Sequence, residues 1–157
     1  MRIGTGFDVH AFGPGTFITL GNVQIPHHFG FVAHSDGDVL IHAICDALLG
    51  ACALGDIGQH FPPSDDQWKD CDSVVFLKHC HQLIQDEGYE IANIDSTIIA
   101  EQPKINPHIK TIQSRLSGIL HLKTNQVGVK ATTTEQLGFT GRKEGIAAQA
   151  VCLLFKV

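Results

Sequence analysis

The chain has 157 residues, of which 43% are hydrophobic and 17% are charged, a composition typical of a globular domain with one core. The formal net charge of -5 and the lack of any run of lysine and arginine argue against a nucleic-acid partner. No apolar stretch reaches the roughly 18 residues of a membrane helix, and the first residues show no signal-peptide pattern, so we expect no membrane partner and a cytoplasmic location.

The first third of the sequence predicts two strands and one helix. Residues 2–11 and 17–26 have the composition and alternation of strands, and we expect them to pair as a hairpin across the turn at residues 13–15. Apolar residues then recur at helical spacing, which predicts a helix from near residue 35 or 36 to about residue 51. Residues 55–71 are rich in glycine and proline and are expected to form a loop.

The rest of the sequence predicts helices and strands in alternation. A helix is expected over residues 72–87, ended by Gly88. The further expected elements are a strand at 89–100, a helix that begins at Asn106 with Pro107 in its first turn, and strands at 126–131 and 146–157. Together these elements predict a single α+β domain over residues 1–157, with helices packed on one face of a mixed sheet plus a hairpin.

Three residues of the first predicted strand and helix suit a metal ion. Asp8 and His10 stand two positions apart, so in a strand their side chains leave the same face. His42 lies within the predicted helix, with Asp38 and Asp46 one turn to either side, and we expect this polar stripe to face water or a ligand. Asp8, His10 and His42 are ligands that zinc accepts, with one tetrahedral position left open. On spacing alone, a cluster of solvated side chains is an equally good interpretation.

His34 and Ser35 stand where the predicted helix begins. Unpaired backbone N–H groups and the positive end of the helix dipole favour a phosphate at such a position, although the same residues also suit an ordinary N-cap. The chain has neither a P-loop motif nor a nucleophile-elbow motif. We therefore expect a site built from metal ligands and hydrogen-bond donors.

Residues 130–145 contain two overlapping S/T-x-x-E/Q pairs, Thr132 with Glu135 and Thr133 with Gln136. This is the capping-box pattern, which predicts that a helical turn begins directly after a strand and offers a second anion site. Glu135 also supplies a hard oxygen ligand, of the kind that holds Mg²⁺ between phosphates. A polar loop with a short helix is the alternative.

Five blocks of the sequence resemble the motifs of one enzyme family in order and spacing. They are GFDVHAF at 6–12, AHSDGDVLIHAICDALLGA at 33–51, LGDIGQHFP at 54–62, DSTIIAEQPKINPHI at 95–109 and VKATTTEQLGFTGRKEGIA at 129–147. Over essentially its whole length the chain resembles the 2-C-methyl-D-erythritol 2,4-cyclodiphosphate synthases of non-mevalonate isoprenoid biosynthesis. It departs from the family at Pro63, where relatives carry an acid.

The resemblance implies a phosphorus-oxygen lyase that converts 4-diphosphocytidyl-2-C-methyl-D-erythritol 2-phosphate to the 2,4-cyclodiphosphate and releases CMP. The attacking group is the substrate's own phosphate, so the protein needs only to position it and to neutralise charge. The resemblance also implies one Zn²⁺ per subunit on Asp8, His10 and His42. A second ion, Mg²⁺ or Mn²⁺, is expected with Glu135 and the substrate phosphates.

The resemblance assigns roles to individual residues. His34, Thr133 and Glu135 are expected to be catalytic, with Ser35 and Thr134 beside them. The residues expected near the methylerythritol part are Asp56, Ile57 and Gly58, and Phe61 and Asp65 are also expected to bind the substrate. The residues expected around the cytidine and diphosphate are Ala100, Pro103, Lys104, Ile105, Asn106, Ala131 and Thr132. Asp46 is our own candidate for a substrate contact or for support of a metal ligand.

Family members are homotrimers with active sites between subunits. The resemblance implies that Asp8, His10 and His42 come from one chain and residues 132–135 from its neighbour, with the sheets facing a central cavity. Phe139 and Arg142 match residues near that cavity, which in relatives can hold an isoprenoid diphosphate.

Two other functions compete with this interpretation. A zinc-dependent phosphoesterase would use the same ligands but would release linear products. A trimeric binding module without enzymatic activity would use the metal only to hold its subunits together.

Overall fold

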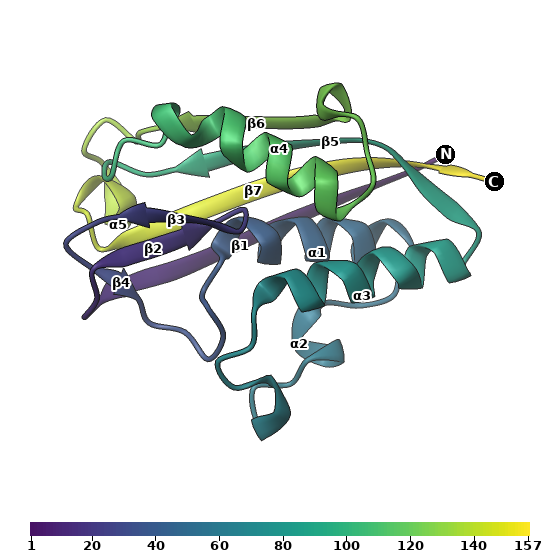
Figure 1. The fold of residues 1–157 in the computed structure, drawn as a ribbon, viewed down its shortest axis with the longest axis horizontal. Coiled ribbons are helices and arrows are strands. Elements are labelled where there is room, and N and C mark those ends of the chain that lie inside the picture. The colour runs from purple at the N-terminus through teal and green to yellow at the C-terminus, as the bar shows by residue number, and fades with distance from the viewer.

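The computed structural model describes all 157 residues and has a five-stranded sheet with its helices on one side (Figure 1). The strands are β1 (Arg2–Gly13), β2 (Phe17–Leu20), β3 (Val23–Pro26), β4 (Gly30–Phe31), β5 (Tyr89–Ile99), β6 (Val127–Thr132) and β7 (Gly145–Lys156). The helices are α1 (Val39–Ala51), α2 (Ile57–His60), α3 (Ser73–Asp86), α4 (Ile109–Ile119) and α5 (Gly138–Gly141), with 3-10 turns at Asp66–Trp68, Asn106–His108 and Thr124–Gln126. The predicted α+β class is confirmed.

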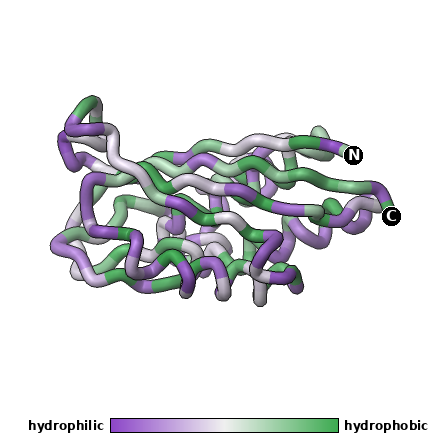
Figure 2. The backbone as a smooth tube through the Cα atoms, turned by 90° about the horizontal axis from the view of Figure 1, so that it is seen from above, coloured by the Kyte–Doolittle hydropathy of each residue, from purple (hydrophilic) through white to green (hydrophobic).

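The sheet brings the two ends of the chain together. Its strand order is β4-β1-β7-β5-β6, in which β1 runs antiparallel to β4 and β7, and β5 runs antiparallel to β7 and parallel to β6. The pairing of β1 with β7 extends from Arg2 opposite Leu154 to Ala11 opposite Gly145, so both termini lie at one end of the molecule (Figure 2). None of the helices has the length and apolar character required to cross a bilayer.

Helix α1 lies directly on β1 because two glycines face it. A Cβ atom built on Gly4 would stand 1.8 Å from the carbonyl oxygen of Ala47, and one on Gly6 would stand 1.9 Å from that of Ala43. Any side chain at these positions would therefore push the helix off the strand. The contact holds the residues that follow Gly6 on the same face of β1 close to the middle of α1.

A buried carboxylate anchors the start of α1. The Asp38 side chain caps the helix by accepting the Ile41 N–H at 3.0 Å, and it also accepts the N–H groups of Gly21 at 2.9 Å and Asn22 at 2.8 Å. Burial raises the pKa of Asp38 to about 6 against the opposing effect of these hydrogen bonds. The expectation that Asp38 faces water or a ligand is wrong, because backbone donors satisfy it inside the core.

The expected hairpin between residues 2–11 and 17–26 is wrong. Residues 17–26 instead form a two-stranded ribbon of their own, β2 with β3. The turn between them is Gly21-Asn22, with φ of 56° and 61°, and residues that accept positive φ favour such tight hairpin turns. The single strand expected over 17–26 therefore folds back on itself, and β1 pairs with β7 and β4.

Three local expectations also change. The first long helix begins at Val39 rather than near residue 35, because Asp38 provides its cap. The expected loop at 55–71 contains α2 and one 3-10 turn. The capping boxes after β6 do not form a helix, because Glu135 and Gln136 have φ of 52° and 65°; α5 begins at Gly138.

We expect Gly6→Ala to reduce the free energy of unfolding by about 3 kcal/mol or more, because the new methyl group would meet the backbone of α1. Urea unfolding at matched protein concentration measures this. Gly118→Ala is the control, since a Cβ there has nothing within 4 Å and the exchange should be neutral or stabilising by up to about 1 kcal/mol. A Gly6→Ala protein as stable as the wild type would contradict the role given to this contact.

Candidate active site

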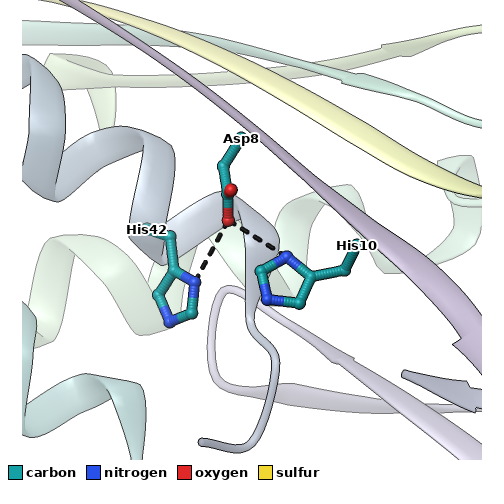
Figure 3. Close-up of side chains that lie close together, drawn as sticks. All are labelled: Asp8, His10 and His42. Carbon is teal, nitrogen blue, oxygen red and sulfur yellow. Dashed lines mark hydrogen bonds and ion pairs between the residues drawn. The ribbon is translucent and has the colours of Figure 1, made fainter. Parts of the chain in front are cut away.

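Asp8, His10 and His42 converge where α1 crosses β1 (Figure 3). Asp8 Oδ2 lies 3.0 Å from His10 Nδ1 and 3.1 Å from His42 Nδ1. One ligand atom from each residue lies within 4.8 Å of the others. The prediction that these three residues come together at a site able to hold a metal ion is confirmed.

The chemistry of these atoms fits a divalent cation. His10 Nδ1 is buried and, although near Asp8, makes no aligned hydrogen bond, so a metal would supply a partner that the protein does not. Burial would raise the pKa of the Asp8 carboxyl, but the close contacts and charge attraction of His10 and His42 outweigh it and hold that pKa well below its usual range. The carboxylate is therefore ionised and ready to bind a cation.

A cavity of about 190 Å³ lies beside the three residues. It is lined by His10, His34, Ser35, His42, Ile57, Gly58, Phe61, Pro63, Trp68, Lys69 and Phe76. The rings of Phe61 and Phe76 lie 4.4 Å apart between centroids, and Trp68 meets Phe61 edge-on at 5.0 Å. These three rings form an aromatic wall of the cavity. The sequence analysis named neither Trp68, Lys69 nor Phe76, and only the apolar character of positions 68 and 76 indicated that they could be buried.

Three predicted acidic residues support the loops around the cavity rather than lining it. Asp46 accepts the N–H of Ile57 at 2.8 Å, and Asp56 caps α2 by accepting the Gln59 N–H at 2.9 Å. Burial raises the pKa of Asp46, while the hydrogen bond from Ile57 opposes that shift. Asp65 caps the 3-10 turn at Asp66–Trp68.

A second pocket, of about 400 Å³, lies at the carboxyl ends of β5 and β6. It is lined by Ala100, Glu101, Pro103, Lys104, Ile105, Asn106, Ala131, Thr132 and Thr133. The structure thus brings together all the residues expected around the cytidine and diphosphate. Carboxyl ends of parallel strands are a common place for ligands.

Glu101 explains why the second anion site differs from the one expected. Its Oε1 accepts the N–H groups of Thr134 at 3.2 Å and Gln136 at 3.0 Å. These backbone donors therefore already hold a carboxylate. Thr133 lies beside them and donates its hydroxyl to Glu135 at 3.3 Å.

The structure does not bring the two halves of the predicted site together within one chain. Strands β7 and β5 separate β1 from β6, which places the strand that carries Asp8 about 14 Å from the one that leads to Glu135. Arg142 lies on the same side as Glu135 and pairs with Glu144 at 3.1 Å. Phe139 is partly exposed on α5.

Fold and site define an α+β protein with a triad, shared by a strand and a helix, that is able to hold a metal ion, and with a separate pocket on the same sheet. The chain belongs to the YgbB family, whose model matches residues 1–155. It is 58% identical over 156 residues to a 2-C-methyl-D-erythritol 2,4-cyclodiphosphate synthase of Xanthomonas oryzae pv. oryzae, covering 99% of this chain and 96% of that one. A synthase of the same name from Ectopseudomonas mendocina is 60% identical, with 99% of each chain covered.

Solved structures agree with this family. A synthase from Plasmodium falciparum in complex with CDP has a TM-score of 0.87 and 37% identity, covering 99% of this chain and 96% of that chain. The bifunctional IspDF of Campylobacter jejuni gives a TM-score of 0.96 and 43% identity; the match covers 99% of this chain but only 42% of that longer one. The family predicted from the sequence is confirmed, and with it membership of the lyases of the non-mevalonate pathway.

We expect removal of the metal to lower the thermal unfolding midpoint. A metal that binds only the folded state, at 100 times its Kd, stabilises it by about 2.7 kcal/mol. In the wild type, a chelator should therefore lower the unfolding midpoint measured by calorimetry, and added Zn²⁺ should restore it. Asp8→Ala should not respond, whereas Asp86→Ala, at an exposed position of α3, should respond like the wild type. A full response in Asp8→Ala would contradict the site.

Proposed function

We propose that this chain, as a single synthase domain over residues 1–157, converts 4-diphosphocytidyl-2-C-methyl-D-erythritol 2-phosphate to 2-C-methyl-D-erythritol 2,4-cyclodiphosphate and CMP. The observation that carries the proposal is the convergence of Asp8, His10 and His42 beside a cavity, in a chain whose relatives are synthases over nearly their full length. We further propose that it works in the cytoplasm, where its five cysteine thiols stay reduced.

The reaction needs positioning more than protein nucleophiles. An oxygen of the 2-phosphate forms a bond to the β-phosphorus, the bond from that phosphorus to the bridging oxygen breaks, and CMP leaves with the electron pair. His34 and Ser35 line the cavity, and in the proposal they donate hydrogen bonds to phosphate oxygens whose charge grows in the transition state. The aromatic wall excludes water that would otherwise compete with the 2-phosphate.

Asp8, His10 and His42 would hold Zn²⁺, and Glu135 would hold Mg²⁺ or Mn²⁺ with the substrate phosphates. When bound, these ions supply positive charge that neutralises the phosphates and polarises their oxygens. The carboxylate and imidazole donors of the triad suit zinc, and the carboxylate of Glu135 suits the harder ions. Thr133, hydrogen-bonded to Glu135, would contribute a hydroxyl on the same side.

The cytidine and diphosphate are assigned to the second pocket. CDP complexes of two similar proteins support a cytidine nucleotide as ligand, and the pocket at the ends of β5 and β6 supplies the cationic Lys104 for its phosphates. Ile57 and Gly58 line the triad cavity and would face the methylerythritol part. Asp46, which accepts the Ile57 N–H, would then set the position of that loop rather than touch the substrate.

We propose that the active enzyme is a homotrimer with its sites between subunits. The face of the sheet opposite the helices exposes large apolar side chains, among them Ile3 and Phe7 on β1, which are 69% and 59% exposed, and a second copy would cover such a face. The separation of β1 from β6 within one chain supports the same arrangement, since Glu135 of one chain would complete the triad of another. The resulting central cavity, near Phe139 and Arg142, could accept an isoprenoid diphosphate.

Phosphorus NMR of the reaction tests the proposed chemistry. We expect the substrate signals to be replaced by those of a cyclic diphosphate and of CMP, in equal amounts. Inorganic phosphate or a linear monophosphate as product would instead identify a phosphoesterase, in which a water molecule takes the place of the 2-phosphate.

We expect His42→Ala to lose zinc and to lower turnover by more than about 100-fold, which exceeds the usual loss for an outer partner of a metal ligand. The trimer should persist, because the apolar sheet face and not the metal holds it together. Metal analysis, turnover and light scattering measure the three quantities, with exposed His28→Ala as the control. Dissociation of the variant into monomers would favour a binding module held by metal, and unchanged turnover would exclude His42 from the site.

A further inference from the structure

Behind His42 lies a buried hydroxyl that no part of the proposed reaction uses. While Nδ1 of His42 faces Asp8, its other ring nitrogen, Nε2, lies 2.9 Å from Oγ of Ser73. Ser73 is the first residue of α3 and is fully buried. A contact between residues from two different helices, made inside the core, orients the imidazole ring much more firmly than a solvent contact could.

Asp36 fixes the orientation of that hydroxyl. The Ser73 hydroxyl donates to Asp36 Oδ1, and the Ser73 backbone N–H donates to Asp36 Oδ2 at 3.1 Å. With its hydrogen directed to the carboxylate, the hydroxyl oxygen presents a lone pair to His42. An acceptor at Nε2 favours the tautomer that carries the ring hydrogen on Nε2, against the Asp8 carboxylate, which lies 3.1 Å from Nδ1 and favours a hydrogen there in the metal-free protein.

That tautomer leaves a lone pair on Nδ1, the nitrogen that faces Asp8 and the candidate metal centre. The opposite tautomer would place a hydrogen there and would oppose a cation. We propose that Asp36 and Ser73 are positioning residues, which hold His42 in the tautomer and ring orientation that bind the metal. This inference rests on the metal centre of the proposed function, and it concerns residues to which the sequence analysis gave no role at the metal centre.

The arrangement also separates the tasks of the two serines near His42. Ser35 Oγ lies 3.3 Å from the same Nε2, but it is farther away than Ser73 and accepts the Gly37 N–H at 3.2 Å. Because Ser73 takes the ring hydrogen, the hydroxyl hydrogen of Ser35 is left for a ligand in the cavity. Asp36 would therefore orient His42 and, through His42, would leave the Ser35 hydroxyl free to donate to a phosphate.

Two measurements test the proposal on the full-length protein. The first is the Kd for Zn²⁺, measured by competition with a chromophoric chelator. The second is the nitrogen NMR spectrum of the His42 ring in metal-free protein, assigned with His42→Ala, which distinguishes the two tautomers without any metal or turnover. Ser117→Ala is the control, since Ser117 is likewise a buried helix serine but donates to the Ser114 carbonyl.

We expect Ser73→Ala to raise the Kd for Zn²⁺ by 10- to 100-fold, the usual effect of losing a partner behind a metal ligand, and to shift the tautomer population of the metal-free protein toward the form with its hydrogen on Nδ1, which faces Asp8. Asp36→Asn should shift both readouts in the same direction, because an amide accepts the hydroxyl hydrogen less strongly than a carboxylate. Ser73→Thr keeps the hydroxyl and should restore both readouts toward the wild type. Ser117→Ala should change neither.

An unchanged Kd and unchanged tautomer populations in both Ser73→Ala and Asp36→Asn would overturn the proposal. An equal loss of Zn²⁺ affinity in Ser73→Thr would also overturn it, because Ser73 would then have only a packing role. A wild-type protein that binds no Zn²⁺ would overturn it as well. Failure of the proposed reaction is distinguishable, because linear products in the phosphorus NMR assay would reject the synthase activity while leaving the zinc affinity and the tautomer unaffected.

Discussion

Direct backbone contact between α1 and β1 is the constraint on which the site depends. Gly4 and Gly6 leave no side chain between strand and helix, so the distance between the two elements is set by main-chain atoms that cannot rotate away. The strand then supplies two ligands on one face, Asp8 and His10, and the helix supplies His42. Three donors thereby converge from only two rigid elements, which is the precision that a metal centre requires.

Much of the fold follows from local patterns, and the largest failure, the pairing of the first strand, has a non-local origin. The expected elements at 72–87, 89–100 and 126–131 correspond closely to α3, β5 and β6, because periodicity and helix ends are written in neighbouring residues. The partner of a strand, in contrast, is not determined by neighbouring residues. β1 pairs with β7 at the opposite end of the sequence, and no local pattern in 2–11 distinguishes that partner from the nearer residues 17–26.

The same division applies to the candidate site. Asp8, His10 and His42 could be predicted because their residue types are unusual for their spacing. Ser73 and Glu101 could not, since each acts by a hydrogen bond to a residue more than 30 positions away, and serine and glutamate at exposed-looking positions carry no signal of their own. Resemblance to a family indicated which residues gather, but not which of them contact each other.

The carboxylates around α1 show why Asp8, and not its neighbours, is suited to bind a cation. Asp38 and Asp46 accept backbone N–H groups, and Asp36 accepts the Ser73 hydroxyl and N–H. Those donors are fixed by the fold and leave little room for a cation. Asp8 instead has only the two imidazoles as close partners, and a neutral imidazole can itself bind a metal ion through the ring nitrogen that carries no hydrogen. Of these four aspartates, only Asp8 has close partners that could bind the same cation as the carboxylate does. A cation can therefore enter the cluster without breaking a backbone hydrogen bond.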